Sequence, residues 1–90
     1  MSDQRYIQAD GILLSVLAED EAILHKADED AYFTLNELSL FMWNVLEQPS
    51  DIAAIVTAVR GAYDVDLARV TADVEALLSD LQEKNLIKPA

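Results

Sequence analysis

The run Ala31–Leu35 has the composition of a strand, and a helix signal follows it at Asn36 with no linker between them. Tyr, Phe and Thr are enriched in strands. Asn is a preferred helix N-cap, and the acidic Glu37 suits the positive end of the helix dipole. A strand that passes directly into a helix places that helix beside its own sheet. The chain is therefore constrained to a fold in which helices pack on a sheet.

Two further strand-like runs precede this one, Ile12–Ala18 and Ala22–Lys26. The polar turns Glu19–Glu21 and Asp28–Asp30 separate the three runs, and such spacing predicts an antiparallel meander. Ile12–Ala18 can also be read as a helical turn. Residues 1–11 are mostly polar, so we expect a flexible N-terminal arm.

Helical patterns occupy the rest of the chain. The first helix begins at Asn36 and is stopped by Pro49. Ser50 is the expected cap of the second helix, which ends near Gly61. Apolar residues at three- and four-residue spacing give each helix one apolar stripe.

The third helix is the longest, with Asp66 as its expected cap. Its apolar stripe repeats over four turns and consists of Leu67, Val70, Val74, Leu77, Leu78 and Leu81. Asn85 can take the left-handed conformation, which would return Leu86 onto Leu81 in a Schellman ending. Strands followed by helices predict an α+β fold over residues 12–90, one domain with a three-stranded antiparallel sheet followed by three helices.

Charge narrows the possible partners. Seventeen acidic and six basic residues give a net charge of −11. This field repels phosphate backbones, so we expect no nucleic-acid partner. The excess of acidic residues either favours a positively charged partner or only keeps the chain in solution. With no apolar run of about 20 residues and no secretory signal, we expect a cytoplasmic protein without a membrane partner.

Catalytic and metal-binding patterns are missing from the sequence. His25 is the only histidine and no cysteine accompanies it, whereas zinc needs several such ligands. The pairs Asp28/Asp30 and Asp64/Asp66 lack the rest of a calcium loop. Two glycines in the whole chain cannot build a glycine-rich phosphate loop. The sequence therefore predicts no catalytic residue, no metal and no cofactor.

Two other small-protein classes also fit poorly. An acyl carrier protein would need an Asp-Ser-Leu motif at a helix start, where this chain has Leu38-Ser39-Leu40. A DNA-binding winged helix would need a basic recognition helix. The third helix here carries Asp66, Asp73, Glu75, Asp80 and Glu83 against Arg69 and Lys84, and this balance argues against DNA.

The ordered series of short motifs resembles the PqqD-like family, named for a pyrroloquinoline quinone biosynthesis protein. These motifs are Tyr32-Phe33-Thr34-Leu35-Asn36-Glu37, Tyr63-Asp64-Val65-Asp66, Asp73-Val74, Leu77-Leu78, Leu81 and Asn85-Leu86-Ile87. The resemblance implies a winged helix-turn-helix-like recognition element for ribosomally made precursor peptides. It also implies that the leader of the precursor adds as a strand beside Ala31–Leu35, flanked by the helix Leu67–Glu83.

Carried onto this chain, the resemblance implies two groups of peptide-binding residues. One group is on the strand edge, Tyr32, Phe33, Thr34 and Leu35, and the other is on the third helix, Val70, Asp73, Val74 and Leu77. Val74 and Leu77 can equally belong to the core. Asp73 is positioned to pair with a Lys or Arg of the leader.

The implied role is non-catalytic: the chain captures a leader peptide and delivers the precursor to a maturation enzyme. The chain lacks a Pro-Glu-Gly stretch before Leu35-Asn36, which favours a lasso-type leader peptidase as that enzyme. The alternatives are a chaperone for a radical-SAM peptide-modifying enzyme and a generic dimeric adaptor. We expect a monomer or a weak dimer.

Overall fold

A computed structural model describes residues 4–90 of the chain. Its main sheet has the strand order β2-β3-β4 and is antiparallel throughout. The strands are β2 (Ile12–Ala18), β3 (Glu21–Lys26) and β4 (Ala31–Leu35). The helices are α1 (Glu37–Val45), α2 (Ile52–Ala62) and α3 (Leu67–Glu83). This winged helix-turn-helix-like α+β arrangement confirms the predicted fold class, and it settles Ile12–Ala18 as a strand.

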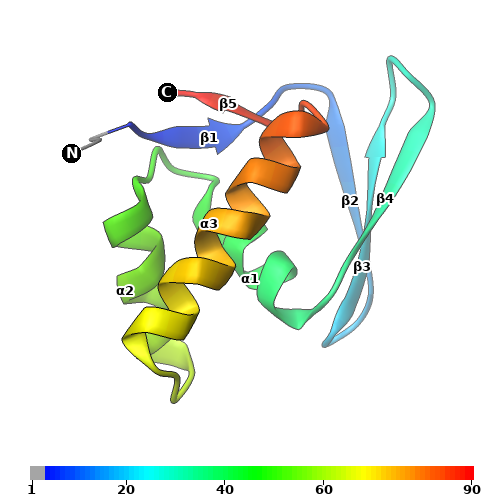
Figure 1. The fold of residues 1–90 in the computed structure, drawn as a ribbon. Coiled ribbons are helices and arrows are strands. Elements are labelled where there is room, and N and C mark those ends of the chain that lie inside the picture. Colours follow the sequence, from blue (N-terminus) through cyan, green and yellow to red (C-terminus); the bar gives the residue numbers. More distant parts are fainter. Residues whose placement is uncertain (1–3) are drawn as a thin grey trace.

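The helices lie on one side of the sheet, and the other side of the sheet carries no helix (Figure 1). The strand register places Ala22 and Leu24 on the helix side, opposite Leu35 and Phe33 of β4. Ala22 and Leu24 are fully buried, and they belong to one cluster with the buried residues of all three helices. We call the helix side the inner face and the open side the outer face.

The N-terminal segment is not the flexible arm that the sequence predicted. Tyr6–Gln8 forms β1, which pairs antiparallel with β5 (Ile87–Pro89) near the opposite end of the chain. The Gln8 side chain also donates to the Trp43 carbonyl at 2.7 Å. Residues 1–3 of the predicted arm lie outside the described residues. The prediction failed because three residues acquire strand structure here from a partner about 80 residues away, which local composition cannot reveal.

All three helices begin at a preferred cap residue, and one of these residues differs from the prediction. Asn36 caps α1 as predicted, and its side chain accepts from the Ser39 N–H at 2.9 Å. The Asn36 N–H in turn donates to the Ser39 hydroxyl oxygen at 2.8 Å, which completes a capping box. The predicted Ser50 cap is wrong: Asp51 caps α2, while the buried Ser50 hydroxyl donates to the Gln48 carbonyl. Asp66 caps α3 as predicted.

The end of α3 is the predicted Schellman motif. Asn85 has a φ of 59°. Its N–H donates to the Gln82 carbonyl at 3.0 Å, and the Leu86 N–H donates to the Leu81 carbonyl at 2.9 Å. Leu86 is fully buried. The turn therefore sends the chain from α3 into β5 and towards β1.

This geometry predicts the effect of substitutions at Asn85. Asn85→Val should lower the free energy of unfolding by about 1–2 kcal/mol, because a side chain branched at Cβ is strained at positive φ. Asn85→Gly is the matched control and should keep or slightly raise stability. Urea denaturation of the two variants measures the difference. Equal stabilities would contradict the role assigned to this turn.

Candidate functional site

The edge of β4 is open. Among residues 4–90, β4 pairs on one side only, with β3. The direction of its free backbone groups follows from the neighbouring pair of strands. The Ala27 N–H donates to the Gly11 carbonyl at 3.4 Å, in continuation of the β2–β3 register. Because hydrogen-bonded and non-bonded positions alternate along antiparallel strands, His25 also bonds towards β2, and Leu24 and Lys26 bond towards β4.

The partners of Leu24 and Lys26 on β4 are Phe33 and Ala31. The backbone N–H and C=O groups of these two residues are therefore used in hydrogen bonds to β3. Tyr32 and Thr34, one position away from them, turn their backbone N–H and C=O groups to the open edge. Two donors and two acceptors are thus available to an added strand.

The side chains of β4 divide between the two faces of the sheet. Tyr32 lies on the outer face and stacks on His25, with ring centroids 4.4 Å apart and planes within 6°. Phe33 lies half-buried on the inner face, and the Lys84 ammonium is 5.5 Å from its ring centroid. Since Lys84 follows α3 directly, this contact places the C-terminal end of α3 next to the middle of β4.

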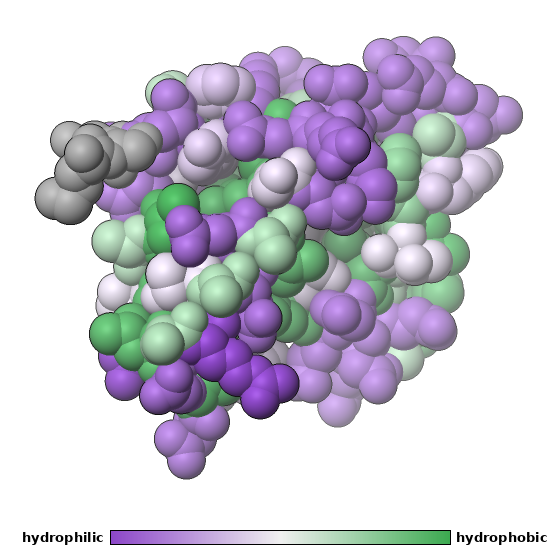
Figure 2. All heavy atoms as spheres, in the orientation of Figure 1, coloured by the Kyte–Doolittle hydropathy of each residue, from purple (hydrophilic) through white to green (hydrophobic). Residues whose placement is uncertain are grey.

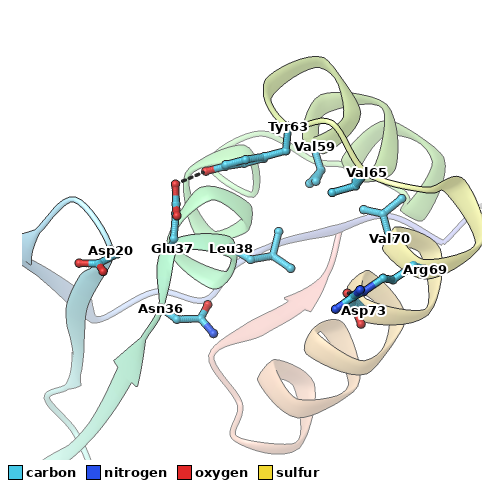
Figure 3. Close-up of a pocket in the computed structure, with 10 residues that line it drawn as sticks. All are labelled: Asp20, Asn36, Glu37, Leu38, Val59, Tyr63, Val65, Arg69, Val70 and Asp73. Atoms are coloured by element: carbon cyan, nitrogen blue, oxygen red, sulfur yellow. Dashed lines mark hydrogen bonds and ion pairs between the residues drawn. The ribbon is translucent and has the colours of Figure 1, made fainter.

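The other end of α3 borders an open cavity of about 440 Å³. Its walls come from the β2–β3 turn, the start of α1, the end of α2 and the first turns of α3 (Figure 3). The lining residues are Asp20, Asn36, Glu37, Leu38, Val59, Tyr63, Val65, Arg69, Val70 and Asp73. Asn36 directly follows β4. The cavity therefore lies at the end of the open edge, and we call the edge, the cavity and the facing side of α3 the β4–α3 groove.

The cavity has an apolar floor and a charged rim. Leu38, Val65 and Val70 present only hydrocarbon. On the rim, the Tyr63 hydroxyl donates to Glu37 at 3.2 Å, and Arg69 lies 3.9 Å from Asp73 (Figure 3). This arrangement suits an apolar side chain of a ligand whose backbone or neighbouring residues meet the charges.

The Tyr63 phenol remains a proton donor in this setting. Desolvation, the hydrogen bond to Glu37 and the negative charge of that carboxylate all raise the pKa of Tyr63 above its ordinary value. Phe41 meets the same ring edge-on, with centroids 5.5 Å apart. The phenol is thus held in place as part of the cavity wall.

The predicted site residues fall into four groups. Val70 and Asp73 line the cavity, while Tyr32, Phe33 and Thr34 lie on the open strand. Leu77 is half-buried against the core. Leu35 and Val74 are buried, Val74 completely, so they support the groove from beneath and do not face it.

Reasoning from the sequence placed only Val70 and Asp73 of the ten lining residues in the site, and the residues it missed include Leu38, Val59, Tyr63 and Val65. They come from α1, α2 and the connection to α3, and Leu38 and Val59 belong to the helical stripes that marked them as core. Tyr63 and Val65 were quoted only as family motifs. Their short Tyr-Asp-Val-Asp run, between two helices, was the available signal.

Two kinds of site are missing from the part of the chain that the structure describes. Residues 4–90 contain no group of three or more His, Cys, Asp or Glu side chains that could hold a metal ion. None of the helices described combines the length and the apolar character needed to cross a membrane.

Comparisons with known proteins were made for the sequence and for the fold. The structure of TbiB1 in complex with the TbiA(beta) leader peptide superposes with a TM-score of 0.80 and 27% identity, covering 91% of this chain and 94% of that one. A lasso peptide synthetase B1 complexed with the leader peptide superposes with a TM-score of 0.77. It is 18% identical, covering 93% of this chain and 98% of that chain, and supports the shared fold. No curated protein matches the sequence.

The family model described as coenzyme PQQ synthesis protein D matches residues 21–87. The match runs from β3 through α3 into β5, so it includes the open strand, all cavity-lining residues except Asp20, and the turn at Asn85. This span is well over half of the chain, and the chain therefore belongs to the PqqD family.

Proposed function

We propose that this protein binds the leader of a ribosomally made precursor peptide and delivers the precursor to a maturation enzyme. The leader adds to the open edge of β4 as a further antiparallel or parallel strand, next to α3. The main support for the proposal is that a strand edge without a partner among residues 4–90 lies next to an apolar cavity. The complex of the 27% identical TbiB1 with a leader peptide supports it.

Backbone and side-chain contacts have different tasks in this mode. Tyr32 and Thr34 supply the backbone donors and acceptors, which hold any extended segment. Side chains of the leader alternate between the faces of the sheet. Those on the inner face meet Phe33, Leu77 and the cavity, so these positions set which sequence fits.

Charge adds a second level of selection. Asp73 is exposed at the cavity rim and shares its charge only weakly with Arg69, at 3.9 Å. A Lys or Arg of the leader would compete with Arg69 for this carboxylate. The net charge of −11 also speeds the encounter with a basic leader.

The role has no catalytic step of its own. Capture of the leader raises the effective concentration of the attached core peptide at the maturation enzyme. A leader peptidase of the lasso type is the favoured enzyme, because the chain resembles a lasso peptide synthetase B1 in fold and lacks the Pro-Glu-Gly stretch. A radical-SAM peptide-modifying enzyme is the alternative that the family name favours.

The direct test is isothermal titration of the protein with the leader peptide encoded near its gene. We expect a single site with a dissociation constant of about 1 μM or lower, about −8 kcal/mol. A scrambled peptide of the same composition is the control. Absence of heat at high micromolar concentration, with the folded protein, would sink the proposal.

Thr34→Pro tests the strand edge. The substitution removes an N–H that points to the open edge and leaves the hydrogen bonds between β3 and β4 intact. A carbonyl of the leader then loses its donor, so affinity should fall about tenfold to a hundredfold, or about 1–3 kcal/mol. Thr34→Ala keeps the N–H and should bind almost as the parent protein does. Unchanged affinity of the folded proline variant would mean that the leader binds elsewhere.

Val65→Trp tests the cavity. Val65 lies in the connection between α2 and α3 and faces the cavity, so an indole there occupies space that a leader side chain needs. We expect affinity to fall by about tenfold or more. Ala62→Trp adds the same ring at a nearby exposed position that does not line the cavity. Both variants are titrated with the same leader, and equal affinities would exclude the cavity from the binding site.

A further inference from the structure

The second open edge of the sheet has a different character from β4. Strand β2 pairs only with β3 among residues 4–90. Its seven residues, Ile12–Ala18, include no charge, no proline and no glycine. Exposed edges of natural sheets usually carry charged residues, proline or a β-bulge, because these features prevent uncontrolled strand pairing. Strand β2 has neither charge nor proline, and its irregularity is a register shift between Val16 and Ala18, near its end.

Apolar side chains are exposed along the whole of β2. Leu13 is 61% exposed, Leu14 38%, Val16 60% and Leu17 57%. The register gives Leu14 and Val16 to the inner face, opposite Leu24 and Ala22, and Leu13 to the outer face. Ile12, at the start of β2, packs against the core, and the other apolar side chains of β2 meet solvent on both faces in the described chain.

The outer face continues the apolar surface across the sheet. Leu13 is opposite His25, which is opposite Tyr32, and these two rings are stacked. Ile23 lies half-buried in the next row. In Figure 2, green hydrophobic atoms emerge at the right-hand side of the molecule, where Figure 1 places the sheet. We call β2 together with Ile23 and His25 the β2 surface.

The backbone of β2 is also available. From the hydrogen bond between Ala27 and Gly11 it follows that the backbone N–H and C=O groups of Leu13 and Ser15 point towards β3. By the same alternation, Ile12, Leu14 and Val16 turn their N–H and C=O groups outwards. The β2 surface therefore offers backbone bonds and apolar area at the same place.

Acidic turns border this surface at both ends. One is Glu19–Glu21, at the β2–β3 turn and the first residue of β3, and the other is Asp28–Asp30, between β3 and β4. Asp30 faces His25 and Glu29 pairs with Lys26. Within residues 4–90 the remaining four carboxylates, Glu19, Asp20, Glu21 and Asp28, have no ion-pair partner.

This charge pattern decides between possible occupants. A second copy placed edge to edge would bring its own acidic turns against these, and each copy carries −11. A partner with an apolar strand or strip bordered by Lys and Arg meets attraction at both ends. The pattern fits the second kind of partner.

We propose that the β2 surface docks the maturation enzyme, through an apolar strand or strip of that enzyme flanked by basic residues. The identity of this partner rests on the proposed function. Strand β3 separates β2 from β4, so the enzyme and the leader bind at opposite edges and at the same time. The enzyme thus holds the carrier without competing for the groove.

The test uses the purified maturation enzyme encoded with the precursor, immobilised for interferometry against the full chain. The double variant Leu13→Ser/Leu17→Ser removes apolar area from β2. Its matched control is Leu67→Ser, at an exposed leucine of α3 that does not line the cavity. We expect the double variant to weaken enzyme binding by at least about tenfold and the control by less than about twofold.

Charge and salt give independent readouts. Glu21→Lys should weaken enzyme binding more than Glu47→Lys, an equal charge change at an exposed site after α1. Binding should also weaken as NaCl rises from about 50 mM to about 500 mM. Leader affinity, measured by titration for every variant, should stay unchanged.

The outcomes separate the two proposals. If the parent protein does not bind the leader, the proposed function is overturned. The enzyme-binding measurements alone then test the β2 surface. If the double variant loses leader binding as well, the Glu21 and Glu47 pair decides. Enzyme binding unaffected by both sets of variants, binding that tightens with salt, or sedimentation showing a dimer through β2 would overturn the docking proposal.

Discussion

Both outer strands of a three-stranded sheet have one row of backbone N–H and C=O groups without a partner, and the path of the chain ends decides whether these rows stay open. In this protein the turn at Asn85 controls that path. Its left-handed conformation and the burial of Leu86 direct the last residues to β1. A chain end that ran beside β4 would have closed the edge. Pairing β1 with β5 leaves both β2 and β4 without a partner on one side among residues 4–90.

The rest of the groove depends on the same geometry. Because α3 must deliver Leu86 to the core, its length runs past β4, from Asp73 at the cavity to Lys84 above Phe33. The capping box at Asn36 fixes where α1 starts and so where the cavity wall with Leu38 stands. A shift of either helix end by one turn, about 5 Å, would separate the cavity from the edge.

Features that depend on neighbours in sequence could be predicted, and features that depend on distant partners could not. The caps Asn36 and Asp66 and the turn at Asn85 were predictable, because each is a local backbone requirement met by a suitable side chain. Ser50 and Asp51 are both good cap residues, and only the tertiary burial of Ser50 distinguishes them. The pairing of β1 with β5 had no local signal. In the site, periodicity placed Val70 and Val74 on one stripe but could not show that the first lines a cavity and the second lies beneath it.

The two open edges raise the question of what makes a leader choose β4. Backbone groups cannot decide, since β2 and β4 both offer alternating free donors and acceptors to any extended segment. Strand β4 has α3 beside its inner face and leads directly into the cavity wall at Asn36, with Asp73 and Arg69 at the rim. In strand β2 most side chains are exposed, and two acidic turns mark its ends. Selection therefore comes from the side chains around each edge, whereas the edges themselves supply affinity that is indifferent to sequence. In the proposed arrangement, one small sheet can therefore bind a peptide and an enzyme at the same time. Each ligand is selected by the side chains around its own edge.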